Sequence, residues 1–206
     1  LYSLAGSLLA QSPSLSDKQA SVKSKEALAV TAVPTVYPAP QKLTLKGASF
    51  SLKPGSVEWQ GQSKADATAV ALLRKILGNS KIKVIVGEVD DPGMSKYSQV
   101  PQKKEAYYLN ISADVITLIG RDESGTYYAA QTLSQLLTSL KGKKTLPTVE
   151  VIDFPDVPFR GSVEGFYGKP WGYQGRISQM KFYGKYQLNT YIYGPKDDPF
   201  HGFSKR

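Results

Sequence analysis

The strand, helix and strand pattern of residues 159–201 constrains the fold of this chain more than any other feature. Residues 159–165 are apolar and β-prone and run into a cluster of Gly, Tyr and Trp, and residues 189–193 are β-branched and aromatic. The segment between them predicts a helix, with four residues on or near one side: Ile177, Met180, Gly184 and Leu188. The pattern therefore predicts a βαβ unit.

This βαβ prediction has a consequence for the two loops that follow its strands. The strands of a βαβ unit are parallel and its crossover is right-handed, so both loops emerge at the same end of the sheet. The first loop is Gly165-Phe166-Tyr167-Gly168 and the second is Lys196-Asp197-Asp198. We expect the two loops to face the same space.

The preceding part of the chain predicts a separate α+β domain. Short apolar or alternating runs indicate strands, and two longer segments have apolar residues at helical spacing. The expected strands are 42–46, 56–60, 82–86, 107–111, 115–119 and 149–152, and the expected helices are 69–77 and 124–140. Several strands with two helices on one face make an α+β domain. Two prolines, Pro155 and Pro158, mark its end, so the predicted units are 1–35, 36–154 and 155–206.

The first residues favour an exported protein. LYSLAGSLLAQS is typical of the end of an apolar signal segment, with cleavage near Ala10 and Gln11, and residues 12–34 have the composition of a linker. The apolar run is too short to span a bilayer. An irregular apolar N-terminus is the alternative. We predict a secreted or periplasmic protein whose signal remnant and linker fill residues 1–35.

Composition excludes some kinds of site. With 41% hydrophobic and 11% aromatic residues, the chain can build a packed core. Lys and Arg exceed Asp and Glu by 26 to 17, but the excess is scattered over short runs, which favours a solvated surface over a nucleic-acid partner. The chain has no Cys and a single His, His201, so no metal site and no cofactor are predicted.

The two loops carry the candidate chemistry. Gly165 allows a ligand to approach the main chain closely, although an ordinary turn after a strand has the same pattern. Three aromatic residues offer faces for stacking on sugar rings, or for packing at a domain interface: Tyr167, Trp171 and Tyr173. The ammonium of Lys196 can donate hydrogen bonds to hydroxyl groups, or pair with the neighbouring aspartates.

These motifs resemble a known family. VEGFYGKPW and QMKFYGKYQLNTYIYGPKDDPFH are similar to the start of the catalytic barrel of glycoside hydrolase family 84, the β-N-acetylglucosaminidases that include the O-GlcNAcases. YPAPQKL at 37–43 and GRDESGTYYAAQTLSQLL at 120–137 resemble the small α+β domain that precedes the barrel in families 84 and 20. The resemblance implies that residues 155–206 form the first βαβ of a (β/α)₈ barrel that the chain does not complete.

The resemblance also implies roles for individual residues. The family's counterparts of Gly165 and Lys196 contact hydroxyls of N-acetylglucosamine, and Tyr167 lies beside them. The implied activity is retaining, substrate-assisted hydrolysis of terminal β-linked N-acetylglucosamine, on O-GlcNAc proteins or on hyaluronan or mucin glycans. Asp197 and Asp198 match a substrate-binding loop of the family, not its catalytic aspartate pair, which we expect beyond Arg206.

Two expectations follow for function. No catalytic residue is named within this chain, so we expect it to be inactive by itself although it derives from an enzyme. The alternative is a non-catalytic glycan-binding or scaffolding module.

Overall fold

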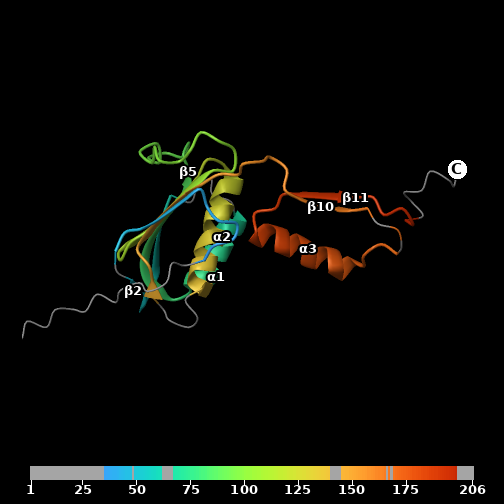
Figure 1. Ribbon diagram of the computed structural model, residues 1–206. Coiled ribbons are helices and arrows are strands. Elements are labelled where there is room, and N and C mark those ends of the chain that lie inside the picture. Colours follow the sequence, from blue (N-terminus) through green and yellow to red (C-terminus); the bar gives the residue numbers. More distant parts are fainter. Residues whose placement is uncertain are drawn as a thin grey trace, which may run out of the picture.

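The computed structural model describes residues 35–47, 49–61, 67–139, 145–165, 167 and 169–198. In this part of the chain, a sheet with two helices against it is followed by a smaller strand, helix and strand unit (Figure 1). The prediction of a mixed α+β domain is confirmed for the first part. Residues 1–34 of the predicted signal remnant and linker (1–35), Phe166 and Gly168 of the first predicted loop, and His201 lie outside the described residues.

The described residues of the first part build a seven-stranded mixed sheet. Its order is β1-β9-β6-β7-β5-β3, and β4 also pairs with β5. The strands are β1 (Lys42–Leu45), β3 (Lys53–Pro54), β4 (Val57–Gln60), β5 (Ser80–Glu88), β6 (Tyr107–Ile111), β7 (Val115–Gly120) and β9 (Val149–Asp153). Two further short strands pair with each other, β2 (Phe50–Ser51) and β8 (Thr145–Leu146). The sequence pattern did not predict β2, β3 or β8, because two residues are too few to show a period.

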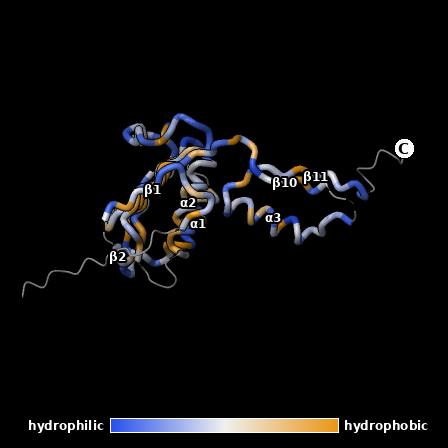
Figure 2. The backbone as a smooth tube through the Cα atoms, viewed as in Figure 1, coloured by the Kyte–Doolittle hydropathy of each residue, from blue (hydrophilic) through white to orange (hydrophobic). Residues whose placement is uncertain are grey.

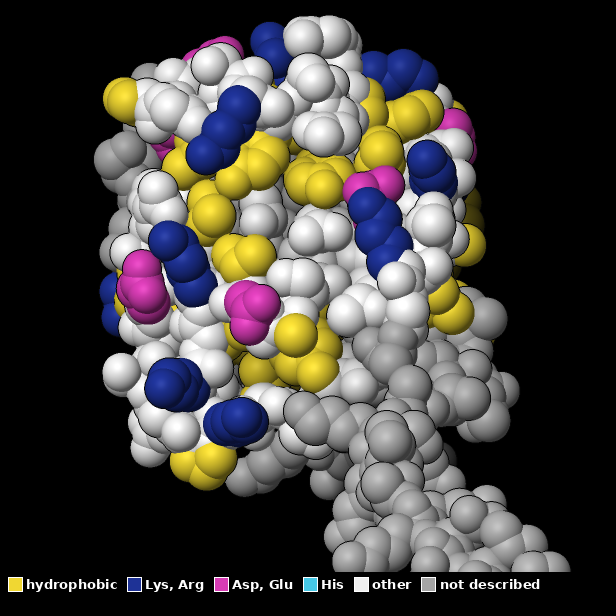
Figure 3. Space-filling view, turned by 90° about the vertical axis from the view of Figure 1, so that its left-hand side faces the viewer, with side chains coloured by type: hydrophobic (Ala, Val, Ile, Leu, Met, Phe, Trp, Pro, Cys, Tyr) yellow, Lys and Arg dark blue, Asp and Glu magenta, His cyan; other side chains and the backbone are white. Residues whose placement is uncertain are grey.

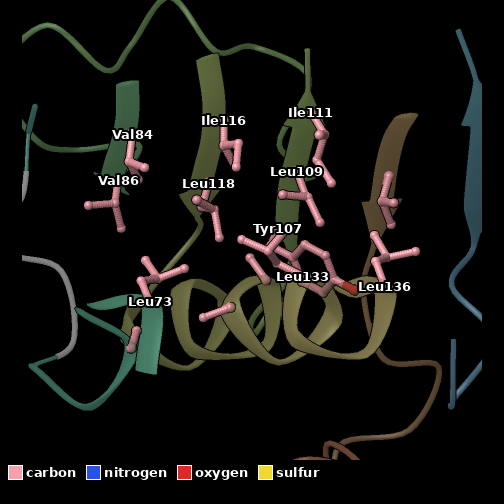
Figure 4. Close-up of a cluster of buried hydrophobic side chains, with 14 of the residues drawn as sticks. Leu73, Val84, Val86, Tyr107, Leu109, Ile111, Ile116, Leu118, Leu133 and Leu136 are labelled. Atoms are coloured by element: carbon pink, nitrogen blue, oxygen red, sulfur yellow. The ribbon is translucent and has the colours of Figure 1, made fainter. Parts of the chain in front are cut away.

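Both helices of this domain cover the same face of the sheet. These are α1 (Ala67–Leu77) and α2 (Glu123–Ser139), and each buries the apolar side that its spacing predicts. Figure 4 shows side chains of three neighbouring strands pointing toward α2, with Leu109 of β6 and Leu118 of β7 near Leu133 of the helix. Each Å² of apolar surface that is buried contributes about 25 cal/mol to the free energy of folding. This cluster is therefore the main stabilising feature of the domain.

A long irregular segment covers the opposite face. Met94, Val100 and Ala106 are buried there against Tyr108 and Ile119 of the sheet. The sequence gave no sign that this segment packs, because its apolar residues have no regular spacing. Both faces of the central strands are therefore buried, as in a sheet between two layers.

The second unit consists of β10 (Gly161–Glu164), α3 (Tyr173–Lys185) and β11 (Thr190–Tyr193). Its strands are parallel and pair in register from Gly161 with Thr190 to Glu164 with Tyr193, as the βαβ pattern predicts. The strands touch at Gly161, where an added Cβ would lie 1.5 Å from the carbonyl oxygen of Thr190. Only glycine allows this approach.

The two faces of this small sheet differ in environment. Ser162 and Tyr191 face α3, where the Ser162 and Tyr183 hydroxyls are hydrogen-bonded and the rings of Tyr183 and Tyr191 lie edge to face. The alternate residues Val163 and Ile192 are 60% and 53% exposed. In Figure 2 this strand pair is mostly pale, with a short hydrophobic stretch outside the core of the first domain. An apolar strand face is thus left open.

The prediction for the apolar side of this helix is partly wrong. Leu188 lies beyond the end of α3, Met180 is exposed, and the buried residue of the helix is Tyr183. Gly184 instead approaches α2, where an added Cβ would lie 2.6 Å from the hydroxyl of Tyr127. The helix packs on a two-stranded sheet and on α2 at once, so its buried residues do not form a single apolar side.

The surface of the first domain carries charges of both signs. Figure 3 shows basic side chains spread among acidic and apolar ones on one face, without a continuous basic stripe. Within the described ranges, no helix has both the length and the apolar character that crossing a bilayer requires.

Candidate functional site

The two predicted loops meet at the carboxyl ends of β10 and β11. The ammonium of Lys196 donates a hydrogen bond to the hydroxyl of Tyr167 over 3.0 Å and lies 4.3 Å from the centre of its ring. Below this contact, the amide of Gly194 donates to the carbonyl of Glu164 over 2.9 Å and extends the pairing of the strands. The loops therefore face the same space, as the parallel βαβ unit requires.

Gly165 lies on the open side of the strand pair. Among the described residues, an added Cβ there would lie within 4 Å of two atoms, Cγ1 of Val163 at 3.0 Å and the carbonyl oxygen of Gly194 at 4.0 Å. The described residues thus leave the main chain uncovered on this side of the strand ends. The structure places Gly165, Tyr167 and Lys196 together, while their contact with a ligand stays a prediction.

Three aromatic side chains that follow β10 are exposed. Tyr167 and Tyr173 are 75% and 72% exposed, and Trp171 is 40% exposed. The exposed Tyr167 ring beside the Lys196 ammonium gives a surface with both an apolar face and a hydrogen-bond donor. Such a surface suits a sugar ring, whose C–H face stacks and whose hydroxyls accept hydrogen bonds.

A buried carboxylate lies directly beneath these loops. Glu164 is the last residue of β10 and is fully buried. Its Oε1 accepts hydrogen bonds from the backbone N–H of Trp171 at 2.8 Å and from Nη2 of Arg176 at 3.1 Å. Its Oε2 accepts from Nε of Arg176 at 3.0 Å and from the hydroxyl of Tyr191. Four donor groups of three residues, Trp171, Arg176 and Tyr191, therefore share one carboxylate.

Contacts of Arg176 continue toward the second loop. Its guanidinium carbon lies 4.5 Å from the centre of the Tyr193 ring, and the Tyr193 hydroxyl donates to Oδ2 of Asp198. A connected path thus runs from Glu164 in the first strand to Asp198 in the second loop. This contact holds Asp198 against its own strand.

The electrostatics of Glu164 favour its charged form. Hydrogen bonds from Arg176 lower the pKa of the Glu164 carboxyl, opposed by desolvation and helped by the N–H of Trp171. A carboxylate with a lowered pKa stays ionised near neutral pH and has no proton to give. Glu164 therefore fits a structural role rather than that of a general acid.

Sequence reasoning missed Glu164, Arg176 and the two strand tyrosines. A signal was present, because Glu164 alternates with the exposed Val163 and must face the helix side of the strand. A glutamate on the buried side of a strand requires a cationic partner. The partner, twelve positions along the chain on α3, is identified only by the fold.

A hollow of about 920 Å³ lies far from these loops, and it is lined by residues of β2 to β5 and the turn after β6. Its charged lining includes Lys53, Lys81 and Asp114. None of the residues that line this hollow belongs to either loop. The candidate site is therefore at the strand ends. Among the described residues no cluster of side chains is suited to hold a metal ion.

Comparison with known proteins identifies both parts of the chain. Residues 33–154 match the family described as glycosyl hydrolase family 20, domain 2, and residues 160–205 match the family described as beta-N-acetylglucosaminidase. The Protein O-GlcNAcase of Rattus norvegicus is 51% identical over 41 residues, which are 20% of this chain and 4% of that protein.

Solved structures agree with these matches. The structure of CpGH84B is 33% identical with a TM-score of 0.71, and the match covers 82% of this chain and 31% of that one. The GH20 exo beta-N-acetylglucosaminidase from Vibrio harveyi, in complex with N-acetylglucosamine, has 19% identity and a TM-score of 0.57, over 79% of this chain and 26% of that one. The latter likeness concerns the fold alone.

This chain thus spans about a third of the length of the solved structures that it matches. It belongs to the glycosyl hydrolase family 20, domain 2 family through residues 33–154, and a family 84-like β-N-acetylglucosaminidase sequence follows.

Proposed function

We propose that this chain supplies the first substrate-binding residues of a retaining β-N-acetylglucosaminidase. Gly165 and Lys196 bind hydroxyl groups of a terminal β-linked N-acetylglucosamine, and Tyr167 lies beside the ring. The contact between Lys196 and Tyr167 at the ends of two parallel strands carries the proposal. The β-N-acetylglucosaminidase match over residues 160–205 supports it independently.

The unit β10-α3-β11 is, in this proposal, the first βαβ of a (β/α)₈ barrel. Its parallel strands and the open apolar face at Val163 and Ile192 suit strands whose neighbours lie elsewhere in a longer protein. Active sites of such barrels lie at the carboxyl ends of the strands. Gly165 and Lys196 occupy those ends.

Proton transfer is assigned to residues other than Asp197 and Asp198. Asp198 accepts a hydrogen bond from Tyr193 of its own strand, which suits a loop support better than a general acid. In substrate-assisted hydrolysis the 2-acetamido oxygen attacks the anomeric carbon, so one carboxylate orients that group and another protonates the leaving oxygen. Binding that is equal in ground state and transition state does not accelerate the reaction. The chain alone therefore binds without turnover.

The test compares two proteins with a chromogenic β-N-acetylglucosaminide. The 206-residue chain should bind N-acetylglucosamine without turnover, and the complete protein that contains it should release the chromophore. Turnover by the chain alone contradicts the assignment of Asp197 and Asp198. Binding without turnover by the complete protein identifies a non-catalytic glycan-binding module instead.

The natural substrate is resolved by three parallel assays of the complete protein. An O-GlcNAc peptide, a hyaluronan oligosaccharide and a mucin glycan each end in, or contain, the proposed sugar.

We also propose that the protein is exported, because its N-terminal residues are apolar. N-terminal sequencing of the mature protein tests it, and a sequence starting near Gln11 is the expected result.

A further inference from the structure

Glu164 lies where both candidate loops begin. Its backbone ends β10 and its side chain binds the backbone N–H of Trp171, seven residues later, at 2.8 Å. This bond ties Trp171 to the end of β10. Tyr167, which lies between these two residues in the chain, contacts Lys196.

The same carboxylate also controls the second loop through its neighbours. Two nitrogens of Arg176 bind it at 3.0 and 3.1 Å, and the guanidinium packs on the ring of Tyr193 at 4.5 Å. Tyr191 donates to it directly from β11. Contacts from both strand ends therefore converge on one buried carboxylate.

We propose that Glu164 is a positioning residue, which sets the distance between Gly165 and Lys196 by holding both loops from below. This inference rests on the proposed function for its sugar ligand. Glu164 does not reach the ligand, because it is fully buried beneath the loops. It acts through Trp171, Arg176 and Tyr191.

Glutamine cannot replace the carboxylate in this arrangement. All four partners are donors, whereas the amide group of glutamine has one acceptor oxygen and a donor nitrogen. Glu164→Gln has nearly the same size, so packing is kept while the nitrogen opposes one partner. The loops should move apart without loss of the βαβ core.

A matched control is available in the first domain. Glu150 binds a cation, Lys46 at 2.5 Å, and a tyrosine hydroxyl, that of Tyr108 at 3.3 Å. Glu150→Gln thus removes a carboxylate with similar partners from a sheet surface remote from the loops. It accounts for any general effect of losing a paired carboxylate.

The first measurement needs no sugar. In Glu164→Gln the backbone amide resonance of Trp171 should shift, and Lys196 should react severalfold faster with an acylating reagent, since its contact with Tyr167 is loosened. Glu150→Gln should leave both values as in the wild type. An unchanged Trp171 resonance with unchanged Lys196 reactivity overturns the inference.

The second measurement is titration with N-acetylglucosamine. Glu164→Gln should bind the sugar at least about tenfold more weakly, because a displaced Lys196 loses its charged hydrogen bond to the sugar. Glu150→Gln should bind like the wild type. Wild-type protein that fails to bind the sugar refutes the proposed function, yet the loop measurements still support Glu164 as positioning residue. Normal sugar binding by Glu164→Gln refutes the inference and leaves the function intact.

A milder variant covers the case in which Glu164→Gln does not fold. Tyr191→Phe removes one donor to the carboxylate without changing charge. It should move the Trp171 resonance and Lys196 reactivity in the same direction, by less. No change in either value overturns the inference.

Discussion

The guanidinium of Arg160 lies 2.5 Å from the carboxylate of Glu105 and joins the strand and helix unit to the first domain. The other oxygen of Glu105 accepts a hydrogen bond from the side-chain nitrogen Nδ2 of Asn189 at 2.9 Å. Arg160 directly precedes β10 and Asn189 directly precedes β11. The backbone N–H of Asn189 donates a hydrogen bond to the carbonyl of Arg160 at 2.8 Å. One carboxylate of the first domain thus holds the amino ends of both strands.

The backbone at Glu105 is shaped for this contact. It has a φ of 62°, in the left-handed region that glutamate rarely adopts. Its N–H donates to Oδ2 of Asp122, whose other oxygen accepts from Gly125 in the first turn of α2. The hydrogen bond to Asp122, directly before α2, holds Glu105 in this uncommon conformation.

Glu105→Ala should therefore destabilise the whole protein. The side chains of Arg160 and Glu105 are 14% and 18% exposed, so Arg160 would lose its partner in a largely buried place. We expect a loss of about 1.5–3 kcal/mol in the free energy of unfolding, the typical cost for a hydrogen bond to a charged group. Urea denaturation measures it.

The control for Glu105 is Glu58, whose carboxylate lies 3.4 Å from Lys83 and is 72% exposed. Glu58→Ala should cost less than about 1 kcal/mol, as exposed pairs do. Equal losses of unfolding free energy in the two variants would show that the Glu105 contact contributes no more to stability than an exposed ion pair.

Lys196→Ala should weaken sugar binding. The ammonium is the charged donor at the strand ends, and the loss of a charged hydrogen bond of about 1.5–3 kcal/mol corresponds to roughly tenfold to 150-fold in affinity. Calorimetric titration with N-acetylglucosamine measures this.

In the complete enzyme Asp198→Ala should keep both limbs of the pH–rate profile, and a lost limb would assign proton transfer to Asp198.

Gly165→Ala should abolish sugar binding while the protein stays folded. The added methyl group points to the open side of the strands, where Val163 is its nearest neighbour at 3.0 Å. Gly172→Ala is the matched control, since an added Cβ there meets no atom within 4 Å. Equal sugar affinity in both variants would show that no ligand approaches Gly165.

Asp153 should make stability depend on pH. Burial raises the pKa of its carboxyl, opposed by hydrogen bonds from the N–H groups of Gln41 and Phe154. Between the ordinary pKa of about 3.9 and the raised value, the folded state holds a proton that the unfolded state has lost. The contribution of the Asp153 carboxyl to the free energy of unfolding is therefore complete below this pH window. It is lost as the pH rises through the window.

Asp153→Asn removes this ionisation. The difference in unfolding free energy between variant and wild type should shift in favour of the variant as the pH rises through the window. Denaturation at a series of pH values from acid to neutral measures the difference. A constant difference would show that Asp153 has the same pKa in both states.

Residues 36–154 should fold by themselves. Both layers over the sheet come from this range, and Val36 is part of the buried cluster. Few apolar groups lose cover when the second unit is absent, although Glu105 loses Arg160 and Asn189. A polypeptide of residues 36–154 should unfold in one cooperative transition, and a gradual change in far-ultraviolet circular dichroism would contradict this boundary.

The sequence by itself determined the strand and helix segments and the meeting of the two loops. Period-2 and period-3.6 patterns are local, and a βαβ unit brings Gly165 and Lys196 to one end because its two strands are parallel. The motifs around them also sufficed to recognise the family. Short strands such as β2 and β8 escaped, because two residues show no period.

Only the tertiary structure decided which charges are buried and with whom. Glu164 and Arg176 are twelve positions apart, and Glu105 and Arg160 are 55 apart, so neither pair shows in a local pattern. The buried side of α3 was also misjudged, because α2 and a two-stranded sheet both contact that helix. Desolvation and pairing depend on neighbours that are distant in the chain, and therefore the supports of the site emerge only when the chain is folded.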